Sequence, residues 1–180
     1  MSCSRNDIAD RVILGVDPGT IVTGYAVIKV TTQEAFAKAS ELQPLDFGCI
    51  RPPVKALLSS RYHVIFQSLN QIIDTHKVTE LAIETPFINK NPASALKLGS
   101  ALGCAIIAAK EHGLRIFGYS PSQVKLGITG RGCATKDDVE AFLRAHLHLR
   151  TATLQPDASD ALSIAVHHAK CSPLHPPKEL

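Results

Sequence analysis

The chain of 180 residues lacks the cysteine and histidine patterns that hold structural zinc or a disulfide framework. Its five cysteines are scattered, odd in number and never form a Cys-x-x-Cys pair. Its eight histidines include no His-x-x-x-His pair, the spacing that would place two rings on one face of a helix. These absences favour buried or incidental thiols in a reducing compartment, and histidines that belong to the core or the surface.

The sequence also lacks a long apolar run and a strong excess of charge. No segment is expected to supply the roughly 18 apolar residues needed to cross a bilayer, and residues 1–10 carry no apolar stretch of the signal-peptide type. We therefore expect a soluble, cytoplasmic protein with no membrane contact. The length and the 45% hydrophobic content suit one domain over residues 11–170, with flexible termini at 1–10 and 171–180.

A carboxylate stands at the end of the first apolar stretch. Residues 12–16 predict a strand buried on both faces, and Asp17 follows at once, before the turn formers Pro18 and Gly19. An unpaired buried carboxylate costs several kcal/mol or takes up a proton. Asp17 therefore either starts an ordinary turn or meets a partner such as a cation.

The remaining apolar patterns predict an α/β fold. Two further strands complete an antiparallel meander, a helix then leads into a parallel strand, and a second helix leads into a fifth strand. We expect a mixed five-stranded sheet with helices on both faces and a loose connection over 31–44. The predicted strands cover 24–30, 45–51, 81–84 and 114–119, and the predicted helices cover 55–77, 92–111, 138–149 and 156–166.

Three further acids share the placement of Asp17. Glu84 ends the predicted strand that lies parallel to the first, so it is expected at the same edge of the sheet. Asp157 and Asp160 lie three residues apart on one face of the last helix, at its start. Carboxylates about 4 Å apart repel by roughly 4 kcal/mol at an effective dielectric near 20. An all-oxygen set of this kind favours Mg²⁺ or Mn²⁺, and a pair of such ions can promote phosphodiester cleavage.

Two other segments allow both an ordinary and a functional interpretation. Residues 120–136 predict a flexible glycine-bearing loop with Lys125, Arg131 and Lys136, either a plain surface loop or a contact for a phosphodiester backbone. The spacing of its glycines is not that of a P-loop. Gly99 and Gly103, four apart in the helix over 92–111, indicate either close packing on the sheet or a self-association surface.

Taken together, these motifs resemble the RuvC family of bacterial Holliday-junction resolvases, also called crossover junction endodeoxyribonucleases. The resemblance runs from about residue 12 to 168 and rests on the segments 14–20, 23–25, 82–84, 91–99, 123–125 and 157–161. It implies an RNase H-like fold and a homodimer that makes paired, Mg²⁺-dependent cuts in a four-way DNA junction, in recombination and repair. The products would carry 5′-phosphate and 3′-hydroxyl ends.

The resemblance also implies roles for particular residues. It makes the four acids the catalytic groups and the ligands of two Mg²⁺ ions, with Mn²⁺ able to substitute. It makes Phe87 an aromatic residue that stacks on a base at the junction. It implies a working partnership with the RuvA–RuvB branch-migration complex. The residues expected to bind DNA are Phe87, Lys90, Lys125, Arg131 and Lys136.

Three alternatives remain open at this point. Residues 16–20 also resemble the first phosphate motif of actin-like phosphotransferases, although the chain has no second glycine-rich phosphate loop. An RNase H-like nuclease without junction specificity would need the same acids. A catalytically silent DNA-binding module would not need all four of them.

Overall fold

The computed structural model describes residues 11–31, 38, 41–85, 92–149, 154–171 and 179–180. Its centre is a five-stranded sheet with the order β3-β2-β1-β4-β5. Strands β1 (Arg11–Asp17), β2 (Thr23–Val30) and β3 (Leu42–Ile50) form the antiparallel meander, and β4 (Glu80–Glu84) and β5 (Arg115–Tyr119) add parallel strands. The predicted mixed sheet and its α/β class are confirmed.

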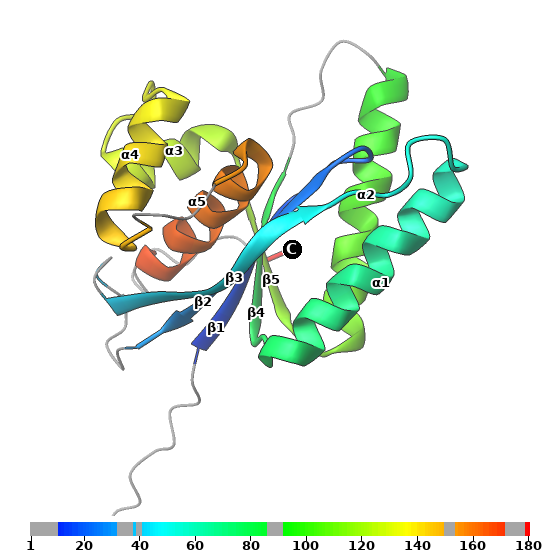
Figure 1. Cartoon of the computed structure of the whole chain (residues 1–180), viewed down its shortest axis with the longest axis horizontal. Helices are drawn as coiled ribbons and strands as arrows, with labels where there is room; N and C mark the ends of the chain where they lie inside the picture. Colours follow the sequence, from blue (N-terminus) through cyan, green and yellow to red (C-terminus); the bar gives the residue numbers. More distant parts are fainter. Residues whose placement is uncertain (1–10, 32–37, 39–40, 86–91, 150–153, 172–178) are drawn as a thin grey trace, which may run out of the picture.

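Helices cover both faces of this sheet (Figure 1). One face carries α1 (Leu58–His76) and α2 (Pro92–Glu111), which pack on each other. The other face carries α3 (Pro121–Thr129), α4 (Lys136–His146) and α5 (Pro156–Lys170). Each layer buries its own apolar cluster against the sheet, and α5 packs directly on β1 and β2.

The apolar periodicity of α1 shows why the sequence folds this way. Ile65, Leu69 and Ile73 are its buried residues, and their four-residue spacing places them on the side that faces the sheet. The helix ends at Lys77, which adopts the left-handed conformation (φ 54°), and its amide closes the last turn on the carbonyl of Ile73. The chain then enters β4 at Glu80.

The prediction of a flexible loop over residues 120–136 is wrong, because this segment contains α3. Ser120 caps the helix by accepting a hydrogen bond from the amide of Gln123, and the Gln123 side chain accepts one from the Ser120 amide. Pro121 occupies the first turn, where its missing N–H costs nothing. Strand β3 also begins at Leu42, inside the connection that was expected to be loose.

The structure also bears on the expectations about membrane-spanning segments and about the C-terminal residues. Helix α2 is long and apolar enough to cross a membrane by length and composition alone, so the expectation that no segment meets this measure is wrong. A single such helix is weak evidence, and α2 packs against α1. Glu179 bridges to Phe117, so this part of the predicted flexible terminus lies against β5, whereas residues 1–10 lie outside the described part. The described cysteines, Cys49, Cys104, Cys133 and Cys171, are free thiols.

Candidate active site

The register of the sheet places Asp17 and Glu84 at one edge. Val16 lies opposite Ile83 in the parallel pairing of β1 with β4, so the next residue of each strand, Asp17 and Glu84, emerges at the shared carboxyl end. Thr23 is fully buried beside this edge, where its hydroxyl donates to the carbonyl of Gly19 over 2.7 Å. This hydrogen bond closes the turn that follows Asp17.

Two glycines bring α5, and with it the other two acids, onto the same edge. A Cβ atom on Gly15 would lie 2.2 Å from the carbonyl oxygen of Ala161, and one on Gly24 would lie 2.0 Å from that of Asp157. Since Gly24 is the antiparallel partner of Asp17, the start of α5 lies directly over the end of β1. Only glycine permits so close an approach of helix backbone to sheet.

The four predicted acids are electrostatically coupled. Burial, and after it the negative charges of Glu84, Asp160 and Asp157 in that order, together raise the pKa of Asp17 to about 7, against the opposing charge of Lys136. Burial and the charge of Asp160 likewise raise the pKa of Glu84. The structure therefore brings together acids that come from two strands and a helix far apart in the sequence, and leaves them with unbalanced negative charge.

A lysine from α4 supplies part of the missing positive charge. The ammonium of Lys136 donates to Oδ2 of Asp160 over 2.7 Å, and this bond, with the nearby carboxylates, raises the pKa of Lys136. The charge of Lys136, and after it that of Lys125 on α3, partly opposes the rise in the pKa of Glu84. Both lysines line a cavity of about 380 Å³ together with Glu84 and Asp160. The site is thus an acidic cluster with basic residues on one side.

The donor chemistry of the site fits hard divalent cations. Within the described ranges, no three His, Cys, Asp or Glu side chains converge closely enough to make a ready-formed metal site. The neighbouring carboxylates nevertheless add to the rise in the pKa of Asp17 and Glu84, and Lys136 pairs with Asp160 as a metal cation would. All four predicted ligands offer oxygen alone, the preference of Mg²⁺ and Mn²⁺. Bound ions would therefore have to draw the acids closer together.

The remaining predicted DNA-binding residues are placed differently. Arg131, between α3 and α4, is exposed and lies 4.0 Å from Oδ1 of Asp138 rather than lining the acidic cavity. Phe87 and Lys90 lie outside the described residues. Only Lys125 and Lys136, of the five residues predicted to bind DNA, are observed beside the acids.

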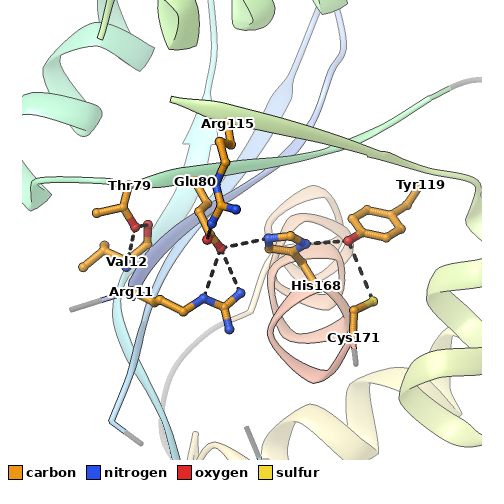
Figure 2. A network of polar contacts seen from close by, with 8 residues as sticks. All are labelled: Arg11, Val12, Thr79, Glu80, Arg115, Tyr119, His168 and Cys171. Carbon is orange, nitrogen blue, oxygen red and sulfur yellow. Dashed lines mark hydrogen bonds and ion pairs between the residues drawn. The ribbon is translucent and has the colours of Figure 1, made fainter. Parts of the chain in front are cut away.

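Sequence reasoning missed a buried polar network that ties α5 to the sheet (Figure 2). His168, near the end of α5, donates from Nε2 to Glu80 over 3.0 Å, and its Nδ1 meets the hydroxyl of Tyr119. Arg11 and Arg115 also donate to the Glu80 carboxylate. The one available signal was a charged residue, Glu80, opening strand β4 ahead of its three apolar residues.

This network favours a deprotonated Glu80 and a neutral His168. Although burial raises the pKa of Glu80, the hydrogen bonds from His168 and Arg11 lower it to about 2. Burial lowers the pKa of His168, so the ring is neutral. Its Nδ1 accepts a hydrogen bond from the Tyr119 hydroxyl, and its Nε2 donates one to Glu80. Glu80 lies on the strand that carries Glu84, and His168 lies on the helix that carries Asp157 and Asp160. The network therefore joins the two elements that supply most of the acids.

A mixed sheet with helices on both faces and acids gathered at its carboxyl edge defines an RNase H-like nuclease. A model of the family described as crossover junction endodeoxyribonuclease RuvC matches residues 13–168. The RuvC protein of Protochlamydia amoebophila (strain UWE25) is 42% identical over 159 residues, which are 88% of this chain and 90% of that protein. The chain belongs to the RuvC family of crossover junction endodeoxyribonucleases, and its function is the resolution of Holliday junctions.

Solved structures agree with this assignment. The structure of T. thermophilus RuvC in complex with Holliday junction substrate matches with a TM-score of 0.85 and 28% identity, over 94% of this chain and 99% of that one. The yeast mitochondrial Holliday junction resolvase Ydc2 shares the fold, with a TM-score of 0.62 at 12% identity over 88% of this chain and 77% of that one. Family membership decides against the actin-like phosphotransferase, the nonspecific nuclease and the silent binding module.

Proposed function

We propose that Asp17, Glu84, Asp157 and Asp160 hold two Mg²⁺ ions and are the catalytic acids of junction cleavage. The observation that carries this proposal is the clustering of the acids around Asp17, where burial and the charges of the other three raise its pKa to about 7. Charge left unbalanced in this way favours binding of a cation, because binding releases the repulsion. Mn²⁺ has the same ligand preference and is expected to substitute for Mg²⁺.

When bound, the ions would supply an activated water and stabilise the oxygens of the phosphodiester as it breaks. The protein's own part is to hold its acids in place around them. Lys136 balances Asp160 in the free protein, and its exposed ammonium can turn to a DNA phosphate when Asp160 takes a cation instead. Hydrolysis that leaves a 5′-phosphate and a 3′-hydroxyl gives ends that a ligase can join.

Basic residues on the α3 and α4 side are proposed to hold the DNA backbone. Lys125 and Lys136 line the acidic cavity, so a phosphate within reach of the acids is also within reach of these ammonium groups. Arg131, on the exposed connection between the helices, would contact the backbone further out. Phe87 and Lys90 remain DNA-binding predictions, which rest on the family resemblance.

A homodimer is proposed from one face of α2. Leu96 and Ile107 expose 74% and 57% of their surface, and Gly99 and Gly103, which lie between them on the same face, have open space where a Cβ would stand. Close packing on the sheet therefore does not explain these glycines. A two-fold pair of active sites suits a junction that needs two symmetric cuts.

The domain organisation, the compartment and the partner complex are proposed from the family. We propose that residues 11–170 act as a single nuclease domain in the cytoplasm, in partnership with the RuvA–RuvB branch-migration complex.

The test uses a synthetic four-way junction and an equal-length duplex. With Mg²⁺ the wild type should cut the junction in two strands and leave the duplex intact, and EDTA should abolish cutting. Asp17→Asn should keep junction binding but lower the cleavage rate by about three orders of magnitude, because it removes a metal ligand. Asp74→Asn, an exposed acid on α1, is the matched control and should cut normally. Normal cutting by Asp17→Asn would overturn the proposed site.

A further inference from the structure

A second cavity lies on the α1 and α2 side of the sheet and belongs to no part of the site above. Its volume is about 370 Å³, and it lies where the turn after β1 meets the first turns of the two helices. Thr20 comes from that turn, Arg61 from α1, and Ser94 and Lys97 from α2. Figure 1 shows these three segments at the end of the molecule toward which β1 and β4 run.

The polar lining of this cavity is positively charged. Of the described residues that line it, Arg61 and Lys97 are the ionisable ones, and none is Asp or Glu. Among the described residues neither cation takes part in an ion pair. The first turns of α1 and α2 carry no acidic residue either, so the partial positive charge of the helix ends adds to that of the side chains.

The Arg61 side chain is held in place by one hydrogen bond, but another of its donors has no acceptor. Its Nη2 donates to the carbonyl of Thr20, which fixes the guanidinium beside the turn that follows Asp17. Its Nε is buried and has no hydrogen-bond partner in the described part of the chain. A buried donor without an acceptor costs about 1–3 kcal/mol, so an acceptor that reaches the guanidinium would relieve this cost after a small adjustment.

The two basic regions lie on opposite sides of the acids. Lys125 and Lys136 approach them from the α3 and α4 layer, whereas Arg61 and Lys97 belong to the α1 and α2 layer on the other face of the sheet. Arg61 is linked to the acids through the turn between Thr20 and Asp17. A DNA strand that crosses the carboxyl edge of the sheet would therefore leave the acids toward this cavity.

The geometry points to a phosphate-binding subsite formed by Arg61 and Lys97, which holds a backbone phosphate of the junction strand on the side of the acids away from Lys125 and Lys136. This inference rests on the proposed cleavage site and adds a second anchor to it. Phosphate suits the lining, because it offers several acceptor oxygens to a guanidinium and an ammonium. Two anchors would fix the strand against rotation about the scissile phosphate.

The test compares junction binding by Lys97→Gln with that by Lys110→Gln, a lysine in the last turn of the same helix and away from the cavity. Binding is measured with Ca²⁺ in place of Mg²⁺ over a range of salt concentrations. Lys97→Gln should weaken binding about five- to tenfold and lower the salt slope by about one for each subunit in contact with DNA. Lys110→Gln should change neither, and both variants should melt at the wild-type temperature.

A second measurement identifies the phosphate. Junctions with a neutral methylphosphonate at one linkage at a time should reveal a linkage that weakens wild-type binding but leaves Lys97→Gln binding unchanged. If the wild type binds and cuts the junction, yet Lys97→Gln shows the wild-type salt slope and linkage profile, the subsite is refuted and the cleavage site stands. If Lys97→Gln turns a dimer into a monomer, the cavity is a contact between copies and the subsite is likewise refuted. Normal cutting by Asp17→Asn would instead refute the proposed cleavage site, whatever the result with Lys97→Gln.

Discussion

Asp17 is the acid expected to carry the largest cost when the proposed site holds no cation. Its carboxyl is partly buried, three other acids raise its pKa, and Lys136 is bonded to Asp160 rather than to Asp17. A residue in this position lowers the stability of the free protein in exchange for affinity toward a positive ligand. The cost should therefore be visible in the protein without metal, as a dependence of stability on pH.

The sign of that dependence follows from the raised pKa. Asp17 has a pKa of about 7 in the fold and near 3.9 when unfolded, so between these values the folded state holds more protons. The free energy of unfolding without metal should fall by up to a few kcal/mol as the pH rises from about 4 to about 7. Asp17→Asn should flatten this fall, since the amide does not titrate, and Mg²⁺ should reverse it in the wild type.

Urea unfolding at several pH values, with and without Mg²⁺, measures this effect. Asp74→Asn is the control, because Asp74 is 68% exposed and lies on α1. Parallel profiles for the wild type and Asp17→Asn would mean that Asp17 titrates normally, against the coupling described above.

At the scale of elements, the active site depends on how closely α5 lies on β1 and β2. Gly15→Ala would place a Cβ 2.2 Å from the Ala161 carbonyl and 2.8 Å from the Cβ of Ala165, so α5 must move away from the sheet. We expect a loss of about 1–3 kcal/mol in the free energy of unfolding. The cleavage rate should fall further than junction affinity, because α5 carries two of the acids and the basic residues lie on other elements.

Gly132→Ala provides the matched control for this change. A Cβ on Gly132 would meet nothing nearer than 4.0 Å, so its stability and cleavage rate should stay close to those of the wild type. The measurements are urea unfolding, junction affinity in Ca²⁺ and single-turnover cleavage in Mg²⁺. If Gly15→Ala cleaves at the wild-type rate, the close approach of α5 is not needed to place its acids.

Most of this arrangement could be predicted from the sequence. Apolar strands that each end in an acid fixed the expected positions of Asp17 and Glu84, and the crossover rule placed them at one edge. Helix α3 was missed because glycines and lysines were taken as loop signals, although the order Ser-Pro-x-Gln from Ser120 is typical of a helix start. The pairing of Glu80 with His168 could not be predicted, because contacts 88 residues apart depend on the packing of the finished fold.

At the scale of the whole molecule, the exposed face of α2 predicts association of two copies. Ile107→Asp would place a charge on the face shared with Gly103, and burying it against a second copy would cost several kcal/mol. We expect this variant to be a monomer in sedimentation and to lose paired cutting of the junction. Val54→Asp changes a residue that is 69% exposed and lies outside α2, so it should stay dimeric. A dimeric Ile107→Asp would place the interface elsewhere.

The central claim, that four carboxylates form a site for two divalent ions, is tested most directly by diffraction from crystals grown with Mn²⁺ and a four-way junction. Anomalous difference density locates manganese independently of the protein model. The account predicts two peaks near one cleavable phosphate, each bound by oxygens of Asp17, Glu84, Asp157 or Asp160, with Lys136 released from Asp160. Manganese bound at other residues, with these four side chains free of metal beside a correctly placed phosphate, would contradict it.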